Sequence, residues 1–126
     1  MIINLTQHLA TPEQIKAGVV DLPPEQREEL IRWLTFDEIP TPGDLNATAH
    51  AIARMAQDAG ADTAMIGGAP FFMPELERVL RYKLIVPVYA FSRRESVEVT
   101  DENGNVRKTA VFRHLGFVRT DWEDIL

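Results

Sequence analysis

The chain contains no cysteine among its 126 residues. Disulfide bonds, zinc–thiolate sites and thiolate nucleophiles are therefore excluded. The chain also has no apolar run close to the ~20 residues that a membrane-spanning helix needs. Its first residues, Met-Ile-Ile-Asn-Leu-Thr, lack the basic segment of a signal peptide. We therefore expect a cytoplasmic protein that does not enter membranes.

The chain has no excess of positive charge. It carries 13 lysine and arginine residues against 19 aspartate and glutamate residues, for a formal net charge of −6. Proteins that bind duplex DNA or RNA generally rely on a broadly basic surface, so this class of partner is not expected. The charge balance leaves room for a local basic pocket. The length fits a single domain spanning residues 1–126.

Several catalytic and cofactor motifs are missing. The chain has no complete GxGxxG fingerprint, so NAD or FAD binding is not expected, and it has no GxxxxGK[ST] P-loop. Neither HExxH nor HxxxH spacing occurs, and no GxSxG elbow surrounds Ser92. The sequence therefore predicts no metal site, no cofactor and no hydrolase triad.

What is present is an alternation of short apolar runs and helical patterns. We predict strands at residues 2–5, 19–22, 63–66 and 84–91, and helices at about 12–17, 25–36, 44–58 and from 73 onward. Pro87 favours a strand with one free edge at that point. Trp122 is expected to pack back onto the domain. This order predicts a single Rossmann-like α/β domain, with a mostly parallel sheet flanked by helices.

Asn103-Gly104 is a strong hairpin signal, and two β-patterned segments, residues 97–100 and 106–111, flank it. We therefore predict a C-terminal antiparallel β-hairpin. A two-residue turn at Asn103-Gly104 would place Arg94 opposite Arg113, and Arg93 opposite His114. Like charges that face each other destabilise a sheet, unless an acid or a bound anion lies between them.

Two interpretations of these arginines stay open. In the first, the guanidinium groups clamp an anion such as phosphate. In the second, a β-bulge shifts the register, or Arg94 pairs with a nearby carboxylate such as Glu95, Glu98 or Glu123.

Ligands of parallel sheets bind outside the carboxyl ends of the strands. The predicted strand ends and the hairpin supply these candidate ligand-binding residues: Thr6, Gln7, Gly67, Gly68, Ser92, Arg93, Arg94 and Arg113. His8 and His114 are the candidate general acid and base. The alternatives are that the glycines serve only close packing and that each histidine is structural. The set predicts a small anionic, nucleotide-like ligand.

The first fourteen residues carry a resemblance. Asn4-Leu5-Thr6, His8 and Thr11-Pro12-Glu13-Gln14 resemble the start of short stand-alone CRISPR-associated proteins with a Rossmann-like fold. Some relatives of that group are similar to ring nucleases, which bind cyclic oligoadenylates across a homodimer and cleave or sequester them. The resemblance implies ligand contacts for Thr6, Gln7 and His8, and a role in antiviral defence.

Two functions follow as hypotheses. The first is binding of a nucleotide or cyclic oligonucleotide, with sequestration or metal-independent phosphodiester cleavage through a ribose 2′-hydroxyl. The second is a protein-interaction module, an inhibitor or adaptor, whose acidic surface binds a basic partner without catalysis. A homodimer is expected, because a two-fold axis would double the shallow site of one small domain.

Overall fold

Five strands form one sheet in the order β2-β1-β3-β4-β5. The computed structural model describes residues 1–121, so the packing predicted for Trp122 lies outside the described residues. Strands β1, β2, β3 and β4 are mutually parallel, and β5 runs antiparallel to β4. The predicted α/β class, with a mostly parallel sheet and a C-terminal hairpin, is confirmed. The strands are β1 (Ile2–Leu5), β2 (Val19–Asp21), β3 (Thr63–Ile66), β4 (Val86–Thr100) and β5 (Val106–Arg119).

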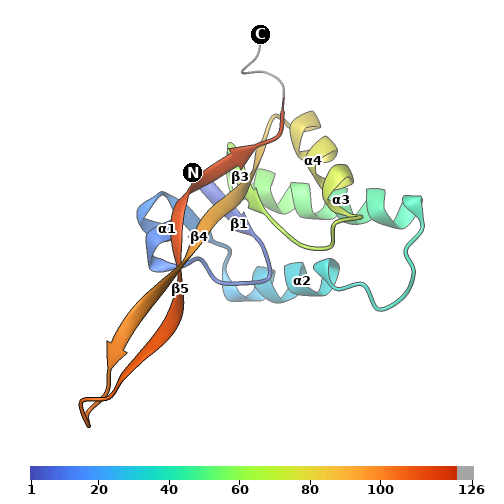
Figure 1. Cartoon of the computed structure of the whole chain (residues 1–126). Helices are drawn as coiled ribbons and strands as arrows, with labels where there is room; N and C mark the ends of the chain where they lie inside the picture. Colours follow the sequence, from blue (N-terminus) through green and yellow to red (C-terminus); the bar gives the residue numbers. More distant parts are fainter. Residues whose placement is uncertain (122–126) are drawn as a thin grey trace.

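Four helices flank the sheet: α1 (Pro12–Lys16), α2 (Pro24–Leu34), α3 (Pro42–Asp58) and α4 (Met73–Tyr82). The crossover through α1 runs toward one sheet edge, whereas the crossovers that lead to β3 and β4 run toward the other. Because parallel crossovers are right-handed, α1 lies on one face and the remaining helices lie on the opposite face. Figure 1 shows α1 on one side of the strands and α2, α3 and α4 on the other.

Local capping fixes where two of the helices begin. Thr11 accepts a hydrogen bond from the backbone N–H of Gln14 at 3.1 Å, and the Gln14 side chain accepts one from the Thr11 N–H at 3.0 Å. This reciprocal pair is a capping box. Thr41 and Asp44 form the same arrangement, so α3 begins two residues earlier than its apolar pattern predicts.

The main core lies between the sheet and helices α2, α3 and α4. Small alanines on α3 allow close packing. The fully buried members include Leu5, Leu30, Ala49, Ile52, Ala53, Phe72, Leu76 and Leu80. A smaller cluster covers the opposite face and consists of Ala10, Val19, Met65 and Val88, with Ile2, Val86 and Phe117 packed against it.

Pro87 occupies a position where β4 is paired on one side only. Pro87 faces Ala64 of β3, but the pairing of β4 with β5 begins one residue later, at Val88. Since proline has no N–H to donate, an unpaired edge is the place where it fits. The predicted free edge at Pro87 is therefore confirmed.

The register predicted for the hairpin is wrong beyond its base. The Gly104 N–H bonds the Asp101 carbonyl at 3.1 Å, and the Asp101 N–H bonds the Asn105 carbonyl at 2.9 Å. Gly104 has φ +80°. This is a three-residue loop closed by a left-handed glycine, rather than a two-residue turn. The observed pairs are Ser92–His114, Arg93–Arg113, Arg94–Phe112 and Glu95–Val111.

At the base of the hairpin, a bulge between Phe91 and Ser92 changes the pairing of β4 with β5 by one residue. Beyond the bulge, β4 and β5 leave the sheet as a two-stranded ribbon; we call residues 92–114 the arm. Its strand from Ser92 to Thr100 spans roughly 30 Å at the rise of an extended chain. Figure 1 shows the arm projecting away from the helices.

None of the helices in residues 1–121 has the length and apolar character needed to cross a membrane.

Two adjacent phenylalanines test the core assignment. Phe72 is 0% exposed and Phe71 is 54% exposed, although both rings contact Phe36 edge-on. We predict that Phe72→Ala lowers the free energy of unfolding by about 3–5 kcal/mol, through lost burial and a residual cavity. Phe71→Ala is expected to cost about 1 kcal/mol or less. Urea unfolding of both variants measures the difference, and equal losses would contradict the assignment.

Candidate functional site

The strand order reverses between β1 and β3. From β1 the chain crosses to β2 on one side, whereas β3 pairs with β1 on the other side. The segments that follow β1 and β3 therefore diverge, which opens a crevice at the carboxyl ends of these strands. A pocket of about 530 Å³ lies there, lined by Thr6, Gln7, His8, Leu9, Thr11, Gln14, Met65, Ile66, Gly67, Gly68, Tyr89 and Ala90.

Five predicted site residues meet in this strand-end pocket. Thr6, Gln7 and His8 come from the segment after β1, and Gly67 and Gly68 come from the segment after β3. The two segments are far apart in the sequence. They become neighbours because β1 and β3 pair in parallel, with Leu5 opposite Ile66 at their ends.

The other five predicted residues do not line the pocket; they are Ser92, Arg93, Arg94, Arg113 and His114. The reason is the length of β4. The sequence suggested a strand that ends near residue 91, but β4 continues to Thr100 and carries these residues onto the arm.

A carboxylate lies between two of the arginines on the arm. Glu95 Oε1 is 3.1 Å from Arg93 Nη2, and Glu95 Oε2 is 3.4 Å from Arg113 Nε. Arg93 and Arg113 face each other across the strands, so Glu95 offsets their repulsion. An internal acid thus occupies the position between them that an anion clamp would leave for phosphate.

Arg94 lies on the opposite face of the ribbon, because side chains alternate along a strand. It faces Phe112, whose side chain is 70% exposed. His114 shares this face and packs edge-on against Phe117, with 4.8 Å between the ring centroids. The Nδ1 atom of His114 is buried and has no hydrogen-bond partner among residues 1–121. Ala90 lines the pocket, and Ser92 lies two residues further along β4. His114 is the cross-strand partner of Ser92, so it lies the same two-residue step beyond the pocket lining.

The pocket rests on a buried polar side chain that the sequence did not mark as structural. Asn4 is 0% exposed within the apolar run of β1. Its Nδ2 donates to the His8 carbonyl and to Asp21 Oδ1, both at 2.7 Å. Its Oδ1 accepts from the Thr6 N–H at 2.9 Å and from the Thr6 hydroxyl at 2.7 Å. The amide therefore fixes the turn that presents Thr6, Gln7 and His8.

Asp21, at the end of β2, completes this network. Besides receiving the Asn4 amide, its Oδ1 accepts from the Ala10 N–H at 3.1 Å. The end of β2 and the segment after β1 are thereby joined. An asparagine placed among apolar residues at a strand end was the available signal.

Three further lining residues with polar side chains were missed as site residues: Thr11, Gln14 and Tyr89. Thr11 and Gln14 also form the capping box of α1. Tyr89 was counted as part of an apolar strand. Its hydroxyl donates to Glu77 Oε2 at 3.0 Å. Burial raises the pKa of the Tyr89 phenol, and the Glu77 hydrogen bond raises it further. Tyr89 is therefore protonated at neutral pH and does not serve as a base there.

Gly67 and Gly68 differ in whether their positions would tolerate a larger residue. Gly68 has φ +153°, and a Cβ there would lie 3.4 Å from Met73 Cε, so a larger residue would be strained. A Cβ on Gly67 would meet only Thr6 Cγ2 at 3.6 Å, an ordinary contact. The main chain at Gly67 is thus exposed to the pocket, and a ligand can approach it closely.

The pocket offers hydrogen bonds rather than charge. Of the residues that the structure describes, no lysine, arginine, aspartate or glutamate lines it. The side chains that can donate or accept come from Thr6, Gln7, His8, Thr11, Gln14 and Tyr89. Within residues 1–121, no group of three or more His, Cys, Asp or Glu side chains could hold a metal ion. The arrangement suits a compact polar ligand.

The Asn4 network gives a direct test of how the site is built. Asn4→Ala leaves the Asp21 carboxylate and the His8 carbonyl without the amide donor. We predict a loss of about 3 kcal/mol in unfolding free energy and faster hydrogen exchange across residues 6–10. Asn46→Ala, which removes a 3.1 Å bond to Glu75 at the helix surface, is the control. A similar small loss in both variants would contradict the role given to Asn4.

Comparisons with known proteins place the chain in one family. Residues 1–118 match the family model described as "Uncharacterized protein MJ1673 family". No curated protein and no solved structure matches the chain. The family match spans β1 through nearly all of β5, so it includes the strand-end pocket and the arm. The chain therefore belongs to the uncharacterized protein MJ1673 family.

Proposed function

We propose that the protein binds a small phosphate-bearing nucleotide ligand in the strand-end pocket. The observation that carries this proposal is the position of the pocket at the reversal of strand order between β1 and β3. Open α/β sheets bind nucleotides in this crevice because diverging loops leave main-chain groups free at the strand ends. The volume of about 530 Å³ lies in the range of small-molecule sites.

The contacts in this proposal are divided between two segments. Thr6, Gln7 and His8 offer polar side chains from the turn after β1. Gly67 and Gly68 line the pocket without a side chain of their own, which allows close approach of a phosphate or a base to the main chain. Arg93 and Arg113 take no part in this proposal, because Glu95 already pairs with both.

Binding without turnover is the activity we propose. Of the two candidate acid–base residues, His8 lines the pocket and His114 lies outside it, packed against Phe117. A paired general acid and base would need both groups within hydrogen-bond reach of one reacting phosphate. The resemblance of the first fourteen residues adds cyclic oligoadenylates to the ligands worth testing. Association of two copies belongs to the same proposal, since a two-fold axis would give the assembly two such pockets.

The first test is a thermal-shift screen against mononucleotides, dinucleotides and cyclic oligoadenylates. We predict a rise in the melting temperature with at least one nucleotide, since a ligand that binds only the folded state stabilises it. The ligand is expected to be recovered intact after incubation, and a 2′-deoxy analogue should behave in the same way. Conversion of the ribonucleotide but not its deoxy analogue would overturn the binding-only assignment. The absence of any shift would favour the interaction-module alternative.

Two variants locate the ligand within the pocket. His8→Ala and Gly67→Ala are each expected to weaken nucleotide binding about tenfold or more, by removing a polar contact and by shielding the main chain. Neither change disturbs a buried contact, so the melting temperature without ligand should stay near that of the wild type. His50→Ala, on the exposed surface of α3, is the matched control. Equal affinities for all four proteins would contradict this site.

A further inference from the structure

A groove lies between α2 and α3, away from the strand-end pocket. It has a volume of about 610 Å³ and is lined by Phe36, Asp37, Glu38, Ile39, Pro40, Leu45 and Phe71; we call it the α2–α3 groove. Its apolar side chains are unusually open to solvent, with Ile39 96% exposed and Phe71 54% exposed. An apolar hollow of this kind, rimmed by polar groups, is typical of a surface that binds another chain.

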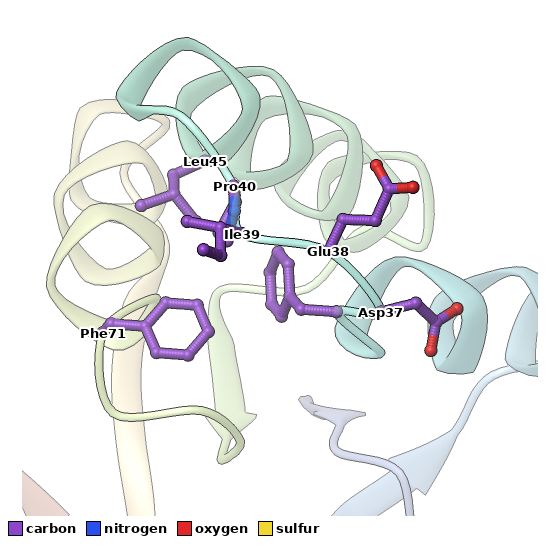
Figure 2. A pocket seen from close by; sticks show the side chains of 7 residues that line it. Asp37, Glu38, Ile39, Pro40, Leu45 and Phe71 are labelled. Carbon is purple, nitrogen blue, oxygen red and sulfur yellow. The ribbon is translucent and has the colours of Figure 1, made fainter.

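The charge at the groove is negative. Figure 2 shows Leu45, Pro40, Ile39 and Phe71 around the hollow, with the carboxylates of Asp37 and Glu38 directed away from them at one end. No ion pair joins either carboxylate to another side chain in the described part of the chain. A fitting occupant therefore offers an apolar side chain with a cation beside it.

The arm of the same chain carries that combination. Phe112 is 70% exposed, and Arg94 lies directly opposite it on the same face of the ribbon. Arg94, unlike Arg93 and Arg113, has no carboxylate partner among the described residues. A two-stranded ribbon is marginally stable by itself, so covering its apolar side chains would stabilise it.

The overall charges agree with this match. The arm, residues 92–114, has five basic and four acidic side chains, a net charge of +1. The rest of the chain has eight basic and fifteen acidic side chains, a net charge of −7. The arm thus carries net charge of the opposite sign to that of the body, which is complementary at the proposed contact.

The arm cannot fill the groove of its own molecule. Figure 1 shows the arm leaving the sheet on the side away from the α2–α3 connection. We propose that the arm of one copy docks in the α2–α3 groove of a second copy, with Phe112 as the apolar anchor and Arg94 beside Asp37 and Glu38. Each copy has both surfaces on different sides of the body, so the contact is heterologous and joins copies head to tail. This inference rests on the association of two copies proposed above and is independent of the nucleotide.

Sedimentation velocity on the wild-type chain and three variants tests the contact. We expect the wild type to form dimers and longer head-to-tail assemblies. Phe112→Asp and Ile39→Asp should each raise the dimer dissociation constant roughly 30-fold or more, as loss of a central anchor does. Phe91→Asp is the matched control, because Phe91 is 54% exposed but lies on the opposite face of the ribbon. Its dimer should resemble that of the wild type.

Mixing the two disrupted variants identifies which surfaces meet. The arm of Ile39→Asp and the groove of Phe112→Asp are both intact, so the mixture should form a heterodimer through that single arm–groove contact. An arm–arm or groove–groove interface would give no such rescue. A monomeric wild type, a dimer unaffected by both substitutions, or a failure of rescue would each overturn the proposal.

The same variants separate this inference from the proposed ligand. Neither Phe112 nor Ile39 lines the strand-end pocket. The monomeric variants should therefore keep their thermal shift with whichever nucleotide stabilises the wild type. Dimer loss with a retained nucleotide shift supports the docking contact and leaves the ligand proposal intact.

Discussion

The strand-end pocket depends on one buried amide. Asn4 is the single polar side chain in the core of the described residues, and its four short hydrogen bonds reach Thr6, His8 and Asp21. Burying an amide is unfavourable unless its donors and acceptors are paired, so the turn after β1 must take the conformation that pairs them. The amide therefore fixes where β1 ends and how Thr6, Gln7 and His8 face Gly67 and Gly68. Because Asp21 belongs to β2, the same network also ties the first crossover to the sheet.

The sequence predicts the elements of the fold better than their extent. Short apolar runs locate β1, β3 and the start of β4, and the Thr11–Gln14 capping box locates α1. The strand order is not written in these local patterns, since it depends on which strands pair across the whole chain. The half of the site formed by Thr6 to His8 and Gly67 to Gly68 was predictable because it needs only parallel strands with aligned carboxyl ends.

The hairpin shows why the other half was not predictable. Asn103-Gly104 indicates a turn, but a two-residue turn and a three-residue loop with a left-handed glycine share that dipeptide. The Asp101 side chain accepts from the Asn103 and Asn105 N–H groups at 2.9 Å and favours the longer loop. A loop one residue longer shifts the pairing of β5 against β4 by one residue, so that the side chains of β5 change ribbon face relative to those of β4. Arg113 consequently faces Arg93 and shares Glu95 with it, whereas Arg94 faces Phe112 on the other side of the ribbon.

The fold thus separates two kinds of surface. The strand ends present a neutral pocket rich in hydrogen-bonding groups, whereas the arm carries the charged and aromatic side chains away from it. The most direct measurement of the central claim is an NMR titration of the isotope-labelled chain with the nucleotide that stabilises it most. The account predicts shifts of the backbone amides of Thr6, Gln7, His8, Gly67 and Gly68, while the amides of residues 92–114 stay unchanged at constant dimer fraction. Shifts confined to the arm, or none at the strand ends, would contradict it.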